Sequence, residues 1–249
     1  MVRASSTSSV RKLDTDLEAF RTRKLEGAFP YVFCHATYVK ARVRGRAVSR
    51  AVVVATGVSA TGDREVLGVE VGDSEDGAFW TAFLRSLRAR GLSGVRLVIS
   101  DRHLGLKAAI ASVFVGSTWQ RCRVHFMRNV LAKVPRASAE LVAAAIRMIF
   151  AQPDAAHVAS QMGEITDMLA GQFPEVAAML RDAREDLLAF ATFPVSHWRK
   201  IWSTNPLERV SGEIKRRTNA VGIFPNGCRL WLHQSARLSP DRGHLGQDG

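Results

Sequence analysis

Asp101 is the first residue whose type and position could support catalysis. Residues 95–100 form a largely apolar run that predicts a buried strand, and Asp101 follows directly after it. Carboxylates at the carboxyl ends of central strands face the crevice in which α/β proteins place their sites. An Asp after a strand also commonly caps the helix that follows. The local sequence leaves the catalytic and the capping interpretation equally open.

Glu208 is the second candidate carboxylate and ends the segment Asn205-Pro206-Leu207-Glu208. A functional interpretation places it on the first turn of a helix, facing the sheet edge near Asp101. The alternative is a capping box, with Asn205 as N-cap, Pro206 at the first helical position and Glu208 closing the box. The local sequence favours the capping box.

Cys122 and His125 have the spacing of half a zinc site. A structural zinc ion needs four ligands, and the sequence contains no second Cys or His pair of suitable spacing. Cys34 and His35 are adjacent, and neighbouring strand residues point to opposite faces. A packed cysteine and a hydrogen-bonded histidine are therefore expected instead of a zinc ligand pair.

Basic side chains gather around the second carboxylate and beside the turn between the first two predicted strands. Arginines interleaved with Trp198 and Trp202 suit a nucleic-acid backbone passing an active centre. The alternative is a solvated helix face in which Glu213 pairs with Arg216 or Arg217. The predicted DNA-binding residues are Lys40, Arg42, Arg199, Lys200, Arg209, Lys215, Arg216 and Arg217.

The charge of the whole chain also points to a polyanionic partner. Its 249 residues include 35 Lys plus Arg against 23 Asp plus Glu, a net charge of +12. Neutralising phosphates releases condensed counterions, so nucleic acid is the leading interpretation, ahead of a merely basic, solvated surface. The three scattered cysteines indicate a reducing compartment. No apolar run is long enough to span a membrane and the N-terminus lacks a secretory signal, so we expect a cytoplasmic protein.

The elements that must position these residues follow from hydrophobic periodicity. Strands are predicted at 31–39, 47–58 and 65–72, with short connections typical of an antiparallel meander. Alternating helices and strands follow over 74–133, and helical periodicity then continues from 138 to 190. A final helix is expected from about residue 205. This order predicts a mixed α/β sheet with a mostly helical block before the last helix.

Several short sequence blocks indicate a protein family only when they are taken together. They are ATYVK (36–40), REVLG (64–68), VISD (98–101) with GLK (105–107), WQRCRVHF (119–126) with RN (128–129), STNPLER (203–209), EIKRR (213–217) and VGIFPN (221–226). Over about residues 7–226 the chain resembles the Mutator-type insertion-sequence transposases of bacteria. The resemblance implies an RNase H-like (retroviral integrase-like) fold with a helical insertion before the last catalytic helix.

The same resemblance implies an Asp-Asp-Glu triad that binds two Mg²⁺ or Mn²⁺ ions. It assigns the second Asp to Asp101 and the Glu to Glu208, both as metal ligands, in place of the capping box. Carboxylate oxygens suit these hard cations, and two ions roughly 4 Å apart serve phosphodiester cleavage and strand transfer. Cys122 and His125 also belong to the family pattern, in a structural or DNA-positioning role.

His35 occupies the position at which family members carry the first Asp. An imidazole suits Zn, Cu or Ni better than Mg²⁺ and cannot supply a bridging negative charge. The sequence therefore predicts a transposase with little or no activity in this copy. The alternative is a catalytically dead transposase remnant that still binds DNA. A ribonuclease or resolvase on the same fold has no support beyond fold analogy.

We expect a division into five segments: a remnant of an N-terminal helical DNA-binding region (1–26), an RNase H-like core (27–135), a helical insertion (136–197), the final catalytic helix segment (198–226) and an atypical, disordered tail (227–249). The tail loses the family pattern and reads like out-of-frame sequence, which predicts a truncated, frameshifted C-terminus. The expected partners are double-stranded DNA, as element terminal inverted repeats and target DNA, and further copies of an intact chain. The expected location is the bacterial nucleoid.

Overall fold

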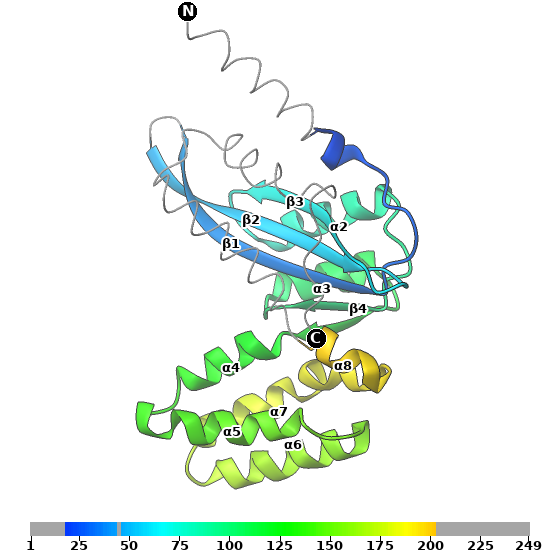
Figure 1. The fold of residues 1–249 in the computed structure, drawn as a ribbon. Helices are drawn as coiled ribbons and strands as arrows, with labels where there is room; N and C mark the ends of the chain where they lie inside the picture. The colour runs from blue at the N-terminus through cyan, green and yellow to red at the C-terminus, as the bar shows by residue number, and fades with distance from the viewer. Residues whose placement is uncertain (1–17, 44–45, 203–249) are drawn as a thin grey trace, which may run out of the picture. The chain divides into compact units, whose positions relative to one another are not determined.

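A computed structural model describes residues 18–43 and 46–202 of the chain (Figure 1). The described chain forms two compact units, one made of residues 18–95 and 104–115 and the other of residues 96–103 and 116–202. Five strands form one mixed sheet in the order β3-β2-β1-β4-β5. This confirms the predicted mixed α/β sheet.

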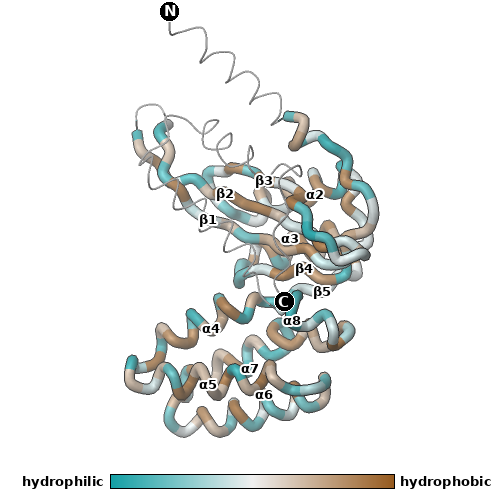
Figure 2. Tube along the Cα trace, in the orientation of Figure 1, coloured by the Kyte–Doolittle hydropathy of each residue, from teal (hydrophilic) through white to brown (hydrophobic). Residues whose placement is uncertain are grey.

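The first unit is built on an antiparallel meander of three strands, β1 (Tyr31–Val43), β2 (Arg46–Val58) and β3 (Arg64–Gly72). β2 is polar where it begins and apolar further along (Figure 2). Its last eight residues are all buried, which indicates that both faces are covered there. Each of these strands agrees closely with the sequence-based prediction, although β1 runs on to Val43.

Helix α2 (Gly77–Ala89) packs against β3 through the apolar stripe that its periodicity predicts. Asp76 caps it by accepting the Phe79 N–H at 2.9 Å. Two glycines of β3 permit the close approach. A Cβ on Gly68 would lie 2.7 Å from Leu87 Cδ2, and a Cβ on Gly72 would lie 2.6 Å from the Phe79 ring. In the same unit α3 (Leu104–Val113) contacts α2, and Arg88 donates to the carbonyl of Val113 at 3.0 Å.

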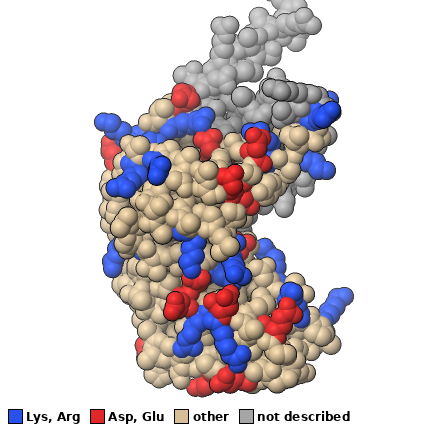
Figure 3. All heavy atoms as spheres, turned by 180° about the vertical axis from the view of Figure 1, so that it is seen from behind, with Lys and Arg blue, Asp and Glu red and all other residues tan. Residues whose placement is uncertain are grey.

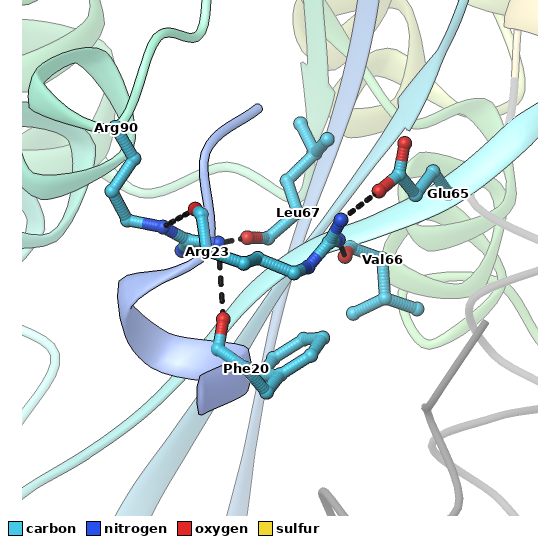
Figure 4. A network of polar contacts seen from close by, with 6 residues as sticks. All are labelled: Phe20, Arg23, Glu65, Val66, Leu67 and Arg90. Carbon is cyan, nitrogen blue, oxygen red and sulfur yellow. Dashed lines mark hydrogen bonds and ion pairs between the residues drawn. The ribbon is translucent and has the colours of Figure 1, made fainter. Parts of the chain in front are cut away.

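A short helical turn at residues 18–22 leads into the first unit and is held by two arginines (Figure 4). Arg90 donates three hydrogen bonds, to the carbonyls of Arg23 (2.9 Å), Leu67 (2.8 Å) and Phe20 (3.2 Å). Arg23 in turn pairs with Glu65 and donates to the Val66 carbonyl at 2.6 Å. These contacts bind the segment that precedes β1 to β3 and to the end of α2.

The second unit begins with two parallel strands, β4 (Leu97–Ser100) and β5 (Thr118–Arg121), paired from Leu97↔Thr118 to Ser100↔Arg121. The residue types alone predict a strand over 117–125, but β5 is shorter. The Cys122 N–H donates to the Ser100 carbonyl at 2.7 Å, and the chain turns at once into a helix.

Helices make up the rest of the second unit. They are α4 (Arg123–Leu131), α5 (Ala139–Ile149), α6 (Ala155–Ala170), α7 (Pro174–Leu188) and α8 (Trp198–Ile201), with short 3₁₀ turns at Arg136–Ser138, Ala189–Thr192 and Val195–His197. The predicted helical block is confirmed, and the regular helices are interrupted at Phe193-Pro194. No helix of the described chain is long and apolar enough to cross a membrane.

Candidate active site

Asp101 lies directly after β4, whose four residues are all buried. Its carboxylate is half-buried, and Oδ1 accepts the N–H of Arg102 at 2.7 Å. Helix α3 begins only at Leu104, so Asp101 stands too early in the chain to be its N-cap. The structure therefore favours the interpretation of Asp101 as a strand-end carboxylate over the capping interpretation.

Arg121 ends β5 and is paired in register with Ser100, the residue before Asp101. Its side chain is buried, and the guanidinium carbon lies 4.8 Å from the centroid of the Phe126 ring. Burial lowers the pKa of Arg121, and the neighbouring charge of Arg102 lowers it further. The carboxylates of Asp101, Asp182 and Asp186 act in the opposite direction.

Two of these charged neighbours of Arg121, Arg102 and Asp182, form an ion pair with each other at 3.7 Å. Asp101 is thus one member of a mixed cluster of arginines and aspartates drawn from the ends of β4 and β5 and from α7. Asp182 and Asp186 could not be found from the sequence, because α7 is far from β4 and β5 along the chain. Arg121 belongs to the WQRCRVHF block, but no role was predicted for it from the sequence.

Cys122 and His125 lie at the start of α4, and both side chains are buried. The complete burial of Cys122 is consistent with the predicted packed cysteine. Within residues 18–43 and 46–202, no three His, Cys, Asp or Glu side chains are arranged to hold a metal ion.

Arg123 connects β5 to the end of the described chain. Its backbone N–H donates to the Trp202 carbonyl at 3.2 Å, and its guanidinium carbon lies 3.6 Å from the centroid of the Trp202 ring. Burial lowers the pKa of Arg123 to about 10. The only hint of this contact in the sequence is that Arg123 lies in, and Trp202 directly before, one of the blocks that resemble the family.

Trp198 is buried, so its ring does not face a passing nucleic-acid backbone as its place among the arginines suggested. Its ring is 4% exposed, and Nε1 donates to the Phe193 carbonyl at 2.9 Å. It packs edge-on against Phe190 with 4.9 Å between ring centroids. The amphipathic turn of α8 explains the difference, because Trp198 and Ile201 face inward while Arg199 and Lys200 are exposed.

The described basic candidates are all on the surface. Lys40 and Arg42 are exposed on β1 and alternate with Val39 and Ala41, which are buried. Basic and acidic side chains are interspersed on the face shown in Figure 3, without a continuous basic surface. Glu208, Arg209, Lys215, Arg216, Arg217 and the tail 227–249 lie outside the described residues.

His35 belongs to the first unit, on β1 opposite Val54 of β2, and is half-buried. Its neighbour Cys34 is fully buried, and burial raises the pKa of that thiol to about 12. Neither β1 nor β2 contains an Asp or Glu. These two strands therefore offer no carboxylate beside His35.

Comparison with known proteins identifies the family to which the chain belongs. The family model described as "Transposase, Mutator family" matches residues 2–231. The transposase for insertion sequence element IS1081 of Mycobacterium tuberculosis is 48% identical over 221 residues, 88% of this chain and 53% of that protein. The transposase for IS256 in transposon Tn4001 of Staphylococcus aureus is 33% identical over 223 residues, 88% of this chain and 57% of that protein.

The transposase for ISRM5 of Rhizobium meliloti is 39% identical over 224 residues, 90% of this chain and 56% of that protein. The chain therefore belongs to the Mutator family of transposases, as the resemblance implied. It spans about half the length of the curated relatives it matches.

Among solved structures, the simian T-cell lymphotropic virus intasome in complex with PP2A regulatory subunit B56 gamma is similar at a TM-score of 0.26 and 10% identity. The alignment covers 48% of this chain and 49% of that one. The HTLV-2 integrase catalytic core domain in complex with magnesium gives a TM-score of 0.24 and 14% identity, over 46% of this chain and 83% of that one. The family assignment does not depend on these partial likenesses.

Proposed function

We propose that this chain is the nucleotidyl-transfer part of an insertion-sequence transposase in which His35 has impaired the chemistry. The reaction is phosphodiester cleavage and strand transfer on element-end and target DNA in the bacterial cytoplasm, at the nucleoid. The observation that supports it most is the position of Asp101, a half-buried carboxylate at the end of a fully buried central strand. Family membership supplies the reaction class.

The donor chemistry at Asp101 fits a divalent cation. Oδ1 accepts the Arg102 N–H, and no other hydrogen bond from a described residue reaches this carboxylate. Hard cations such as Mg²⁺ prefer carboxylate oxygen. When bound by Asp101 and Glu208, two such ions would supply activation of the attacking hydroxyl and stabilisation of the leaving oxygen.

The partnership proposed between Asp101 and Glu208 rests on family membership. Cys122 is hydrogen-bonded to Ser100, and the next residue, Arg123, is hydrogen-bonded to Trp202. Glu208 follows Trp202 by six residues. Glu208 itself lies outside the described residues.

His35 is the reason to expect impaired catalysis. A neutral imidazole adds no negative charge to a site that must hold two dications, and β1 and β2 provide no other acid. A second candidate function follows from the same observation, namely a DNA-binding protein without catalysis. The exposed basic residues Lys40, Arg42, Arg199 and Lys200 would then contribute to DNA binding and to hetero-oligomers with intact transposase.

The test is cleavage of labelled duplexes that carry the ends of the element encoding this chain, with Mg²⁺ or Mn²⁺. We expect the unaltered chain to be nearly inactive and His35→Asp to gain metal-dependent cleavage. Asp101→Asn or Glu208→Gln, each added to His35→Asp, should abolish that gain. Strong cleavage by the unaltered chain would overturn the role given to His35.

A second test, which does not depend on activity, measures the thermal unfolding of the protein at increasing Mn²⁺ concentrations. A ligand that binds only the folded state raises the melting temperature, and the rise is larger when the ligand binds more tightly. His35→Asp should show a larger Mn²⁺-dependent rise than the unaltered chain. His35→Asn is the matched control, because Asn has the size of Asp but no charge. It should not show this rise.

A further inference from the structure

Helix α5 is apolar on its exposed face as well as on its buried face. The buried face contributes Val142, Ile146 and Ile149 to the core of the second unit, where α5 contacts α4 and α6. On the opposite face Leu141 is 59% exposed and Met148 is 51% exposed. A surface helix normally carries polar side chains opposite its buried stripe, so α5 departs from the usual pattern.

The exposed apolar residues of α5 follow a regular spacing. Ala144 lies between Leu141 and Met148 in the sequence and is also exposed, which gives steps of three and four residues. The same steps continue just outside the helix to Ala137 and Ala151, both exposed. Such a stripe is the seam through which two helices pack in a coiled coil. Single exposed apolar residues are common on protein surfaces, whereas a continuous apolar patch marks an interaction site.

Two residues of opposite charge border this stripe. Glu140 and Arg147 are both exposed, and Arg147 Nη2 donates to Glu140 Oε1 at 2.7 Å. Residues seven apart lie on nearly one line along a helix of 3.6 residues per turn, so both charges occupy the same edge of the stripe. The exposed residues of α5 therefore carry no net charge. DNA and anionic lipid surfaces attract basic residues, so a neutral apolar stripe favours a protein partner.

The order of the two charges makes this face complementary to itself. In a twofold interface, a contact of one residue with another is repeated with the two copies exchanged. An antiparallel pair of α5 helices centred near Ala144 brings Glu140 of each copy beside Arg147 of the other. Leu141 of each copy then packs near Met148 of the other. In a parallel pair the two charged edges would lie on opposite sides of the interface, so these charges would not meet.

We propose that the exposed face of α5 is a self-association surface, on which the same face of a second copy of this chain packs antiparallel. Ala144 lies at the centre, where its small side chain lets the two helices approach closely. Glu140 and Arg147 exchange their contact within one chain for contacts with the other copy. This inference goes beyond the proposed function and does not depend on the metal site or on catalysis.

The test is sedimentation velocity of the full chain over a range of protein concentrations. The 11 residues of α5 span about 16 Å, too little to bury the roughly 800 Å² per partner of a standard interface, so we expect a weak, reversible dimer. Leu141→Gln and Met148→Gln keep the helix propensity but make the stripe polar. Each should raise the Kd of the dimer about 10-fold or more, because both copies lose an apolar contact. Val195→Gln, at an exposed apolar position outside the stripe, is the matched control and should leave the Kd unchanged.

Charge variants test the antiparallel arrangement. Glu140→Arg should raise the Kd about 10-fold, because it places like charges opposite each other at both ends of the interface. Arg147→Glu should have the same effect for the same reason. A mixture of the two variants should form heterodimers that are tighter than either homodimer, because opposite charges then face each other. Neither variant can form the ion pair between positions 140 and 147 within its own chain, so a preference for heterodimers reports a contact between chains.

Several outcomes would overturn α5 as the self-association surface. One is a chain that stays monomeric throughout the concentration range, and another is a dimer that tolerates both Leu141→Gln and Met148→Gln. Loss of the dimer in these variants without a preference for heterodimers in the mixture would overturn the antiparallel arrangement. Urea unfolding of dilute protein should be nearly the same for all these variants. A large loss of stability in dilute Leu141→Gln would mean that the chain itself covers this face, which also contradicts the proposal.

Discussion

The side chain of Gln120 is hydrogen-bonded to the backbone of Phe190, with 2.8 Å between Oε1 and the amide nitrogen. Its Nε2 donates to the carbonyls of Leu187 and Arg121, each at 2.9 Å. Gln120 is fully buried on β5, so one side chain joins the strand to the end of α7 and the turn after it. Leu187 and Phe190 are themselves buried.

Gln120→Met should therefore destabilise the protein although the volume is nearly conserved. It leaves buried backbone groups of Phe190 and Leu187 without partners, which costs about 2–4 kcal/mol in total. Urea unfolding measures the change. Gln172→Met, at an exposed position of the same unit, is the control and should change the free energy of unfolding little. Equal stabilities of the two variants would contradict this account.

Arg90→Met should release the segment that precedes β1. The variant loses three hydrogen bonds to the carbonyls of Phe20, Arg23 and Leu67 (Figure 4). Hydrogen bonds to charged donors are worth about 1.5–3 kcal/mol each but are not additive here, so we expect a loss of roughly 2–4 kcal/mol. Hydrogen exchange at residues 20–25 should rise more than in β2. Arg85→Met on the exposed side of α2 should leave both readouts unchanged.

Cys34 should make stability fall at alkaline pH. Burial raises the pKa of its thiol to about 12 in the folded protein, against about 8.5 for an exposed thiol. Above about pH 9 the unfolded chain loses the proton and the folded chain keeps it, so the stability contribution present below pH 9 declines toward pH 12. Urea unfolding from about pH 8 to about pH 10 should show a shallower decline in Cys34→Ala. Parallel declines would count against the raised pKa.

Lys40 and Arg42 should contribute to the salt dependence of DNA binding. They are exposed at alternate positions of β1 and so project from the same face. If each neutralises one phosphate, the double variant Lys40→Ala/Arg42→Ala should reduce the slope of log K against log salt by about 1.8 on duplex DNA. Fluorescence anisotropy at several salt concentrations measures it. A slope identical to that of Arg136→Ala would remove these two residues from the DNA-binding set.

The sheet was predictable because its strands carry strong local signals. The apolar run of β2, the alternation of β3 and the apolar stripe of α2 each encode burial in the order of the residues themselves. The end of β5 was not predictable. The backbone bond from Cys122 to Ser100 decides where that strand stops, and Ser100 lies outside any local window around Cys122.

For the candidate site, the sequence by itself determined the residue types and their order: Asp101 after a strand, a histidine at position 35 and family blocks that name Glu208. Only the tertiary structure decided which charges surround Asp101 and what Trp198 and Trp202 do. Arg121, Asp182 and Asp186 come together because β5 and α7 pack in three dimensions, and the tryptophans turn inward because burying their rings removes apolar surface from water. The pattern of residues along the chain predicts which side chains are buried, whereas the packing of distant segments determines which charge or ring each buried side chain contacts.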